Sequence, residues 1–389
     1  MSVLRDLSLS ALAAGFVTVL VGFASSAAIV LQAASAVGAT PDQVSSWMLA
    51  LGVGIGLTCV LPSLRYRAPV VTAWSTPGAA LLVTSAAGLS IDEATGAFIV
   101  SGALIALAGF SGGFERVIDR IPVPLASGML AGVLLRFGLA VFVAMSTRFA
   151  LVLAMFAAYL LARRLAPRYA MIAAVGVGVA VAFTQGLLRA EALHIALAAP
   201  VWVTPRFSAG ALVGVALPLF IVTMASQNVP GVAVIRASGY AVPISPIIGW
   251  TGVANVALAP FGGFALNLAA ITAAIAMGRE AHEDPRRRYV AAVSAGLFYA
   301  LVGLFGATVV GLFAAFPREL VAAIAGLALL ATIGNGLAAA LRDASQREAA
   351  LVTFLMTASG VTLWGVGSAF WGLLAGVATL LLLRGGRGG

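Results

Sequence analysis

Polar side chains interrupt several long apolar runs of this sequence, and the largest such cluster could bind a small solute inside a membrane. Ser226, Gln227 and Asn228 stand together before Pro230, in a run that begins at Ala209. Polar groups left unpaired in lipid cost several kcal/mol, so these side chains must face the protein interior. We interpret Gln227 and Asn228 as substrate contacts.

Two further apolar runs contain isolated polar groups. Ser25 and Ser26 are interpreted as substrate contacts, with helix–helix hydrogen bonding as the alternative. Arg136 is the one charge clearly inside a run, where an arginine costs roughly 2.5–3.5 kcal/mol on insertion scales. It could serve as a gate or as a charge partner for a substrate carboxylate, and it could equally extend to the membrane interface.

Two other apolar runs are broken by residues that oppose a helix. The first reads Pro-Val-Val-Thr-Ala-Trp-Ser-Thr-Pro-Gly over residues 69–78, and the second reads Pro-Phe-Gly-Gly-Phe-Ala-Leu-Asn over residues 260–267. Backbone freed from helical bonding survives at membrane depth only where it is buried in protein or lines a cavity. A matched pair of broken runs therefore indicates the substrate site of a transporter.

Each broken run is expected to start as extended chain and to continue as a half-length helix. In the first, Ser75 or Thr76 is the expected cap of a helix that runs from Pro77 to about Ala87. In the second, Asn267 is the expected cap. Each helix start near mid-membrane could favour an anion by up to ~2 kcal/mol. The alternative is a pair of kinked helices capped for packing alone.

The candidate substrate-binding residues all lie in or beside these interrupted runs. They are Ser25, Ser26, Trp74, Ser75, Thr76, Gly78, Gln227, Asn228, Phe264, Ala265, Leu266 and Asn267. We predict no catalytic residue, metal site or cofactor, because no run carries paired carboxylates, a Cys/His pair or metal-ligand spacing. The single cysteine, Cys59, is interpreted as a small packing residue.

The composition identifies the kind of protein that must position these residues. Of 389 residues, 62% are hydrophobic and 9% are charged, and the mean hydropathy is +1.09. A soluble domain has roughly 45–50% apolar and 25% charged residues. We therefore expect an all-α polytopic membrane protein. The net charge of +9 comes from scattered arginines without any lysine, so the sequence does not predict a nucleic-acid groove.

Spans of ~20 residues, cut at charged and turn-forming clusters, give fourteen predicted crossings. They lie at about 9–36, 45–63, 68–87, 93–112, 122–145, 149–165, 169–188, 208–235, 243–260, 261–278, 289–314, 318–340, 348–363 and 365–383. Both termini then lie on one side with 17 arginines, while the other side holds Arg148, Arg189, Arg206 and Arg318. This bias predicts that both termini are cytoplasmic.

The same map predicts an inverted repeat of seven plus seven crossings, with repeats at 1–190 and 205–389 and with crossings 3 and 10 part extended and part half-helix. An odd number of crossings inverts the second repeat. Short sequence echoes support it at offsets of 201 (Gly38 and Gly239), 195 (Pro122 and Pro317) and 190 (Ala79-Ala80 and Ala269-Ala270).

Four strings carry a resemblance to a known family. Val-Thr-Ala-Trp-Ser-Thr-Pro-Gly-Ala-Ala (71–80), Met-Ala-Ser-Gln-Asn-Val-Pro-Gly (224–231), Pro-Phe-Gly-Gly-Phe-Ala-Leu-Asn-Leu-Ala-Ala-Ile-Thr-Ala-Ala (260–274) and Gly-Ser-Ala-Phe-Trp-Gly (367–372) resemble the bacterial benzoate/proton symporter family. The resemblance covers nearly the whole chain. That family is related in fold to nucleobase permeases and to sulfate and bicarbonate carriers.

The resemblance implies a core domain of crossings 1–4 and 8–11 (about 7–114 and 208–315). A gate domain of crossings 5–7 and 12–14 (about 120–190 and 317–384) would move against it. Substrate would lie between the half-helices of crossings 3 and 10, beside crossings 1 and 8. Nucleobase permeases carry acids on crossings 8 and 10, where this chain has Gln227, Asn228 and Asn267. Neutral amides fit a carboxylate, which embedded acids would repel.

We therefore expect a secondary transporter of the bacterial inner membrane, not an enzyme, that imports benzoate or a similar aromatic carboxylate with a proton. The expected partners are the substrate, the proton and the lipid bilayer, with a second copy of the chain as a candidate and without nucleic acid. The alternatives are a transporter of another small organic anion or of a nucleobase-like substrate, and a passive anion channel.

Overall fold

The computed structural model describes residues 6–86, 88–112, 122–166, 169–189, 191, 195–279, 281–361, 363 and 368–385. In the first half its elements are α2 (Leu9–Ala36), α3 (Pro41–Tyr66), β1 (Thr72–Trp74), α4 (Thr76–Ser85), α5 (Ile91–Phe110), α7 (Val123–Thr147), α8 (Phe149–Leu165) and α9 (Ala170–Thr184). In the second half they are α10 (Ala209–Ala211), η3 (Leu212–Ala216), α11 (Leu217–Thr223), η4 (Met224–Asn228), α12 (Val229–Ala237), α13 (Ile244–Leu258), η5 (Ala259–Phe261), β2 (Leu266–Leu268), α14 (Ile271–Met277), η6 (Pro285–Arg287), α15 (Tyr289–Leu304), α16 (Gly306–Ala315), α17 (Arg318–Leu341), α18 (Arg347–Ala358) and α19 (Ser368–Gly385).

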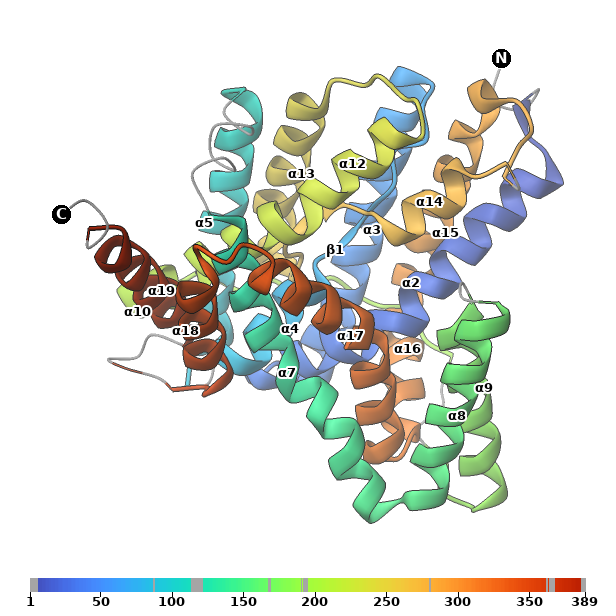
Figure 1. Cartoon of the computed structure of the whole chain (residues 1–389). Coiled ribbons are helices and arrows are strands. Elements are labelled where there is room, and N and C mark those ends of the chain that lie inside the picture. Colours follow the sequence, from blue (N-terminus) through green and yellow to red (C-terminus); the bar gives the residue numbers. More distant parts are fainter. Residues whose placement is uncertain are drawn as a thin grey trace.

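Long apolar runs form most of these helices, because a helix satisfies its own backbone groups where no water is present. Within the described ranges, six helices are long and apolar enough to span a membrane, or eight if each of two bent pairs counts as one span. The chain thus has a mostly helical, polytopic membrane-type fold (Figure 1). Each of the fourteen predicted ranges holds a helix or a strand followed by a helix, but fourteen crossings remain a prediction.

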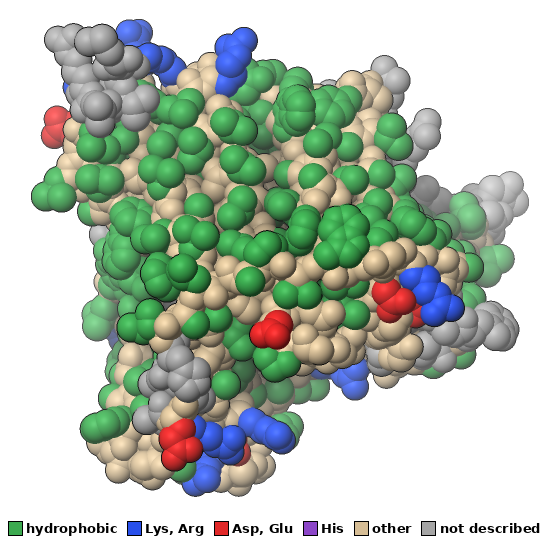
Figure 2. Space-filling model, turned by 180° about the vertical axis from the view of Figure 1, so that it is seen from behind, with side chains coloured by type: hydrophobic (Ala, Val, Ile, Leu, Met, Phe, Trp, Pro, Cys, Tyr) green, Lys and Arg blue, Asp and Glu red, His purple; other side chains and the backbone are tan. Residues whose placement is uncertain are grey.

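Apolar side chains cover much of the outer surface. Figure 2 shows them spread over one broad face, with charged side chains mostly toward its edges. Leu57 and Leu61 of α3 and Trp250 of α13 are among the exposed large apolar residues. A water-soluble protein rarely exposes apolar area so widely, whereas a surface that meets lipid does so by default.

The two broken runs meet at the centre of the fold. β1 and β2 form a two-stranded antiparallel sheet, in which Ala73 pairs with Asn267 at the middle of the register. α4 follows β1 directly, and α14 follows β2 after two residues. The extended entries are present as predicted, whereas their pairing with each other was not predicted. This pairing satisfies backbone groups that two broken helices would otherwise leave unbonded.

Helix packing separates the elements into two groups. In the first group, α3 packs against α15, α5 against α13, and α2 against α15 and α4. In the second, α7 packs against α17 and α18, α8 against α9, and α18 against α19. The helices named in the first group fall within the predicted core domain, and those named in the second fall within the predicted gate domain; the division into two domains stays a prediction.

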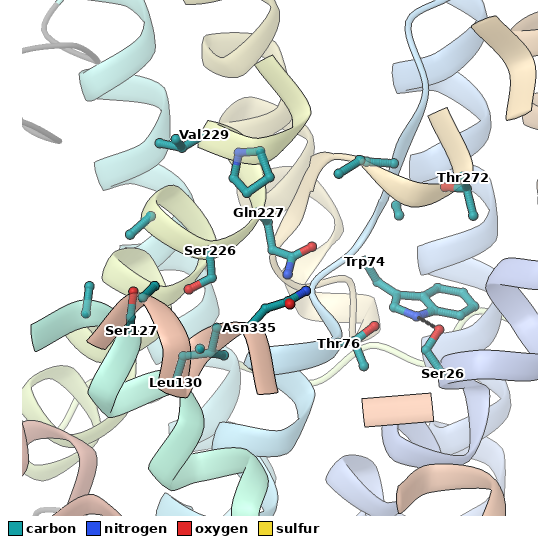
Figure 3. A pocket seen from close by; sticks show the side chains of 18 of the residues that line it. Ser26, Trp74, Thr76, Ser127, Leu130, Ser226, Gln227, Val229, Thr272 and Asn335 are labelled. Carbon is teal, nitrogen blue, oxygen red and sulfur yellow. Dashed lines mark hydrogen bonds between the residues drawn. The ribbon is translucent and has the colours of Figure 1, made fainter. Parts of the chain in front are cut away.

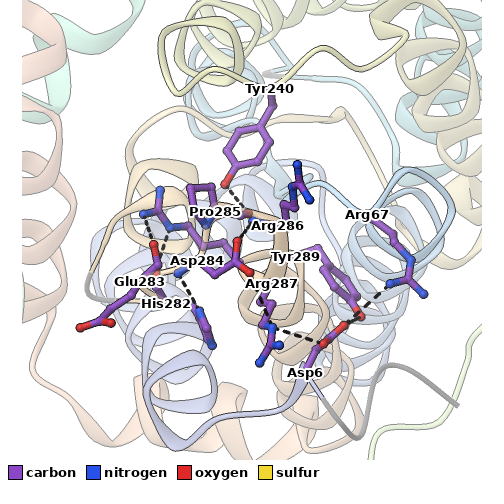
Figure 4. Close-up of polar contacts among 11 residues, drawn as sticks. Asp6, Arg67, Tyr240, His282, Glu283, Asp284, Pro285, Arg286, Arg287 and Tyr289 are labelled. Atoms are coloured by element: carbon purple, nitrogen blue, oxygen red, sulfur yellow. Dashed lines mark hydrogen bonds and ion pairs between the residues drawn. The ribbon is translucent and has the colours of Figure 1, made fainter.

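Loop contacts define two opposite ends of the molecule. At one end, which we call the terminal face, Asp6 pairs with Arg67 after α3 (3.8 Å) and with Arg287 before α15 (3.6 Å), and the Tyr289 hydroxyl donates to Asp6 (2.8 Å) (Figure 4). The Tyr240 hydroxyl donates to the carbonyl of Pro285 there. These loops are all ones that the arginine count assigned to the side of the termini.

The opposite end, which we call the connector face, is organised by the segment between the two predicted repeats. Arg206 N donates to the Asp92 carbonyl at the start of α5, and Val203 N donates to the Pro260 carbonyl after α13. Ala198 N donates to the Leu304 carbonyl at the end of α15. The arginine count assigned the loops at Asp92 and Pro260 to the side away from the termini, whereas Leu304 falls inside the predicted crossing 289–314.

Two of the sequence echoes fall on similar local structure. Gly38 and Gly239 both adopt a left-handed conformation after α2 and α12 (φ 75° and 82°), and Pro122 and Pro317 both occupy the N-cap of a long helix. The echo at offset 190 falls on different local structure, since Ala79 and Ala80 lie in α4 whereas Ala269 and Ala270 lie between β2 and α14. The inverted repeat stays a prediction.

Candidate functional site

A cavity of about 480 Å³ lies where the paired broken segments meet the second group of helices. One wall comes from α2, β1, α4, η4, α12, the turn before α14, and α15. The other comes from α7 and α17. Figure 3 shows the Gln227 and Asn335 side chains directed into the cavity between these walls, with Thr76 and Trp74 beside them. None of the described lining residues is charged.

The aromatic part of the first wall is held by a short hydrogen-bond chain. Trp74 Nε1 donates to Ser26 Oγ (2.7 Å), and Ser26 Oγ donates to the Gly22 carbonyl (2.7 Å). The Trp74 ring packs edge to face on Phe23 and lies 6.0 Å from the Tyr299 ring. Ser26 therefore lines the cavity, but its hydroxyl already accepts a hydrogen bond that holds the Trp74 indole in place.

Helix capping at α4 decides between the two alternatives that the sequence left open. Ser75 is the cap, since its side chain accepts from Gly78 N (2.9 Å). Ser75 is fully buried, and neither it nor Gly78 lines the cavity. Thr76 does line it and is free of the capping role. In the first broken run, Ser75 therefore caps the helix and the neighbouring Thr76 lines the cavity.

The polar cluster of the second repeat lies in a turn of π-helix. η4 covers Met224–Asn228, and Pro230 follows at the second position of α12. A π turn is rare and often marks a functional site, and here it ends where proline has no N–H to donate. Ser226 and Gln227 face the cavity as a result. Gln227 is the predicted contact that the structure positions most directly.

Asn228 and Asn267 do not take the positions predicted for them. Asn228 is fully buried and accepts from Leu268 N of β2 (2.9 Å), so it supports the strand instead of facing the cavity. Asn267 lies within β2, where its Nδ2 donates to the Ala265 carbonyl (2.8 Å). It does not cap α14, whose N-cap is Ala270 without a side-chain bond. The expected cap failed because two residues separate the strand from the helix.

A residue that the sequence analysis overlooked completes the support of β2. Asn255 of α13 accepts from Leu266 N (2.7 Å) and donates to the Leu266 carbonyl (3.2 Å). It therefore bonds the strand edge as a neighbouring strand would. An asparagine inside the apolar run 243–260 was the available signal, because a buried amide must find partners.

Cys59 performs a related task on β1. Thr72 N donates to Cys59 Sγ (3.1 Å), and the hydroxyls of Thr58 and Thr72 lie 2.6 Å apart. Cys59 is fully buried. Cys59 therefore does more than pack. From α3 it accepts a backbone N–H of β1, as Asn255 accepts one of β2 from α13.

The remaining predicted contacts lie behind the cavity. Phe264 stacks with Phe98 (5.2 Å) and packs against Trp47 (5.4 Å), and it is fully buried. Ala265 has a positive φ of 48°, and its carbonyl accepts from Ser75 N (3.0 Å). Leu266 is buried in β2. These residues shape the second broken run but do not line the cavity.

Ser25 and Arg136 are the last two predicted site residues. The side chain of Ser25 lies outside the described residues, so its predicted contact has no structural test. Arg136 is exposed and is absent from the cavity lining, and its guanidinium lies beside Gly360, just after the end of α18. This position agrees with the alternative that Arg136 extends away from the site, near carbonyl groups at a helix C-terminus.

The second wall of the cavity was not predicted. Ser127 and Leu130 of α7 and Asn335 of α17 line it. Asn335 stands between Gly334 and Gly336 in an otherwise apolar run, and that polar interruption was the signal available.

Seven polar side chains line the cavity without a hydrogen-bond partner among the described residues. They are Thr76, Ser127, Ser226, Gln227, Thr272, Tyr299 and Asn335. Neutral donors without internal partners are suited to a solute that brings acceptors of its own. The cavity can therefore receive a small molecule with both an apolar and a polar part.

The chain matches the model of a family described as benzoate membrane transport protein, over residues 5–382. It is 50% identical over 373 residues to the inner membrane protein YdcO of Escherichia coli (strain K12), across 96% of this chain and 95% of that protein. It is 40% identical over 379 residues to the benzoate membrane transport protein of Acinetobacter baylyi, across 97% and 96%.

Solved anion transporters share the fold. SLC26A9 aligns with a TM-score of 0.60 at 14% identity, across 95% of this chain and 65% of that one. The transmembrane domain of the cyanobacterial bicarbonate transporter BicA aligns with a TM-score of 0.59 at 14% identity, across 95% and 98%. At such identity the likeness concerns the fold alone.

Proposed function

Because the chain belongs to the benzoate membrane transport protein family, we propose that it is a secondary transporter that imports benzoate or a similar aromatic carboxylate by proton symport. The family is one of membrane transporters and not of enzymes. One observation carries the substrate class: an uncharged cavity at the paired broken segments, with an aromatic wall and unpartnered neutral donors. Benzoate combines a flat apolar ring with one carboxylate, and the cavity offers a surface for each.

The ring has a natural place against the indole of Trp74 and the phenol ring of Tyr299. Both side chains line the cavity and are almost fully buried, so their orientations are fixed before the substrate arrives. Trp74 is further held by its bond to Ser26. Aromatic pairs in offset or edge-to-face geometry contribute ≈ 0.5–1.5 kcal/mol beyond the area that they bury.

The carboxylate fits the polar part of the same wall. Thr76 opens α4, where the partial positive charge of a helix start favours an anion, and Gln227 and Ser226 approach from η4. A hydrogen bond to a charged group is worth ≈ 1.5–3 kcal/mol. An acidic side chain here would repel the substrate.

Transport requires the cavity to open to each side in turn. The α7 residues of the cavity come from its first two turns, and the α17 residues come from its last two turns. The arginine count assigns both of these helix ends to the side of the termini. With fourteen crossings in a seven-plus-seven inverted repeat and cytoplasmic termini, this arrangement is an inward-open state. The group containing α7 and α17 would then act as the gate against the core.

The proton needs a carrier other than a cavity carboxylate, since no acidic side chain is among the described lining residues. The substrate carboxyl itself can be that carrier, because its own pKa lies near that of a side-chain carboxyl. A homodimer, the second partner considered from the sequence, stays a prediction.

Ligand binding to the purified protein tests the substrate class. We expect benzoate to raise the midpoint of thermal unfolding, while uracil, sulfate and bicarbonate leave it unchanged, because only the aromatic acid fills both parts of the cavity. Stabilisation by uracil alone would contradict the carboxylate assignment. Stabilisation by bicarbonate but not by benzoate would instead indicate that the chain transports inorganic anions.

A further inference from the structure

The cavity is larger than one unsubstituted ring requires. Its volume is about 480 Å³, which is roughly three times the ~150 Å³ of an apolar cavity that takes up benzene. The carboxylate of benzoate uses part of the difference at the wall of Thr76 and Gln227. With the carboxylate placed there, the rest of the cavity is bordered by α7 and α17, which form the second wall.

That remaining space is not lined by apolar groups alone. Ser127 of α7 and Asn335 of α17 border it, and neither has a hydrogen-bond partner among the described residues. Asn335 is exposed at the cavity, and Gly336, its neighbour, packs on α7 near Ala131. Asn335 thus lies on a helix face that is held close to α7, with its amide toward the solute.

On the opposite wall, several polar side chains already use their hydrogen-bonding groups within the protein. The Ser26 hydroxyl both accepts from Trp74 and donates to Gly22, and Ser75 and Asn228 are committed to backbone groups. The free polar groups thus lie on both walls, with Thr76, Ser226 and Gln227 on the first and Ser127 and Asn335 on the second. Figure 3 shows the Gln227 and Asn335 side chains reaching toward each other between the walls.

We propose that Ser127 and Asn335 form a second polar subsite, so that the substrates of this chain are aromatic acids with a hydrogen-bonding ring substituent, such as a hydroxyl, remote from the carboxylate. This inference rests on the proposed function and names its substrate class more closely. A hydroxyl bound there pairs with the amide of Asn335 and the hydroxyl of Ser127. A substrate ring without a hydroxyl leaves the Asn335 amide and the Ser127 hydroxyl bonded to water or without a partner.

Affinity measurements on the purified full chain test the proposal with five acids: benzoate, para- and meta-hydroxybenzoate, and the para- and meta-methylbenzoates of similar size. The methyl compounds separate volume from hydrogen bonding. We expect at least one hydroxybenzoate to bind about fivefold or more tightly than its methyl counterpart, as one net hydrogen bond provides. Equal binding of each pair by the unmodified protein overturns the subsite.

Two variants assign the preference to the subsite. Asn335→Leu keeps the volume and removes the amide, and Ser127→Ala removes the hydroxyl with little change in packing. Each should reduce the ratio of hydroxybenzoate affinity to methylbenzoate affinity, measured within the same variant. Ser146→Ala, an exposed change near the end of the same helix α7, is the matched control and should retain the preference.

The outcomes separate this inference from the proposed function. If both variants fold and keep the hydroxyl preference, Ser127 and Asn335 do not bind the ring substituent and the inference is wrong. That result would leave the proposed transport of aromatic acids unaffected. If none of the five acids binds to the unmodified protein, the proposed function itself fails. Should Asn335→Leu fail to fold, Ser127→Ala still decides the first question.

Discussion

At the scale of single residues, the cavity divides the predicted contacts into two kinds. Ser26, Trp74, Thr76 and Gln227 line it. Ser75, Asn228 and Asn267 instead use their side-chain polar atoms to bond backbone groups behind it. Sequence patterns reveal that a polar side chain inside a membrane run needs a partner, but they do not reveal whether the partner is the substrate or the backbone.

Gln227 is the residue whose loss should affect the substrate most directly. Gln227→Ala removes the amide that faces the cavity from η4, so we expect benzoate affinity to fall by about tenfold or more, the equivalent of ≈ 1.5–3 kcal/mol for a bond to a charged group. Titration calorimetry on the purified protein measures this. Gln185→Ala, at an exposed glutamine after α9, is the control, and equal affinities in the two variants would remove Gln227 from the site.

At the scale of elements, the two short strands are the feature on which the site depends. β1 and β2 pair with each other, and each is bonded on its other side by a neighbouring helix, through Cys59 and Thr58 for β1 and through Asn255 for β2. These bonds replace the neighbouring strands that a two-stranded sheet lacks.

Asn255→Leu should damage folding more than substrate contacts. The change leaves Leu266 N and the Leu266 carbonyl without their partner in a buried region, at a cost of about 1–3 kcal/mol for each unpaired group. We expect a lower thermal midpoint and a lower yield of folded protein. Gln227→Ala is the useful contrast, because it should retain the midpoint; a normal midpoint in Asn255→Leu would refute the role of Asn255.

The sequence predicts the order and extent of these elements well, because apolar runs and charged loops record where chain can lie in lipid. The two broken runs, the extended entries and the half-length helices follow from Pro77, Gly262 and Gly263. Strand pairing does not follow, since three residues per strand carry no alternation to read. The assignment of Asn267 as a cap failed for a similar reason, because the helix start depends on where the strand ends.

At the scale of the whole molecule, the cavity lies between two groups of helices that pack mainly among themselves. Nearer the connector face, α7 and α17 are in close contact, with Gly326 against Val141 and Phe137 and Gly138 against Ile333. Toward the terminal face, the same two helices line the cavity. The two helices stay together at this level as well, with Gly336 near Ala131 and Ser127, so the cavity lies between this pair and the first group of helices.

Cysteine labelling tests which side the cavity faces. Cys59 is fully buried and its pairing with Thr72 shields it, so a new cysteine can be introduced without removing it. Ala339→Cys, on the cavity side of α17, should react with a membrane-impermeant maleimide in inside-out vesicles and be protected by benzoate. Reaction only in right-side-out vesicles would reverse the assigned orientation.

The most direct test of the account is benzoate uptake into proteoliposomes that contain the purified chain, with an imposed pH gradient. Proton symport predicts that an acidic exterior drives internal benzoate above the external concentration and that an uncoupler abolishes the accumulation. Gln227→Ala proteoliposomes should remain near the level of empty vesicles. Benzoate that only equilibrates, at a rate indifferent to the gradient, would contradict symport and identify a passive pathway for anions.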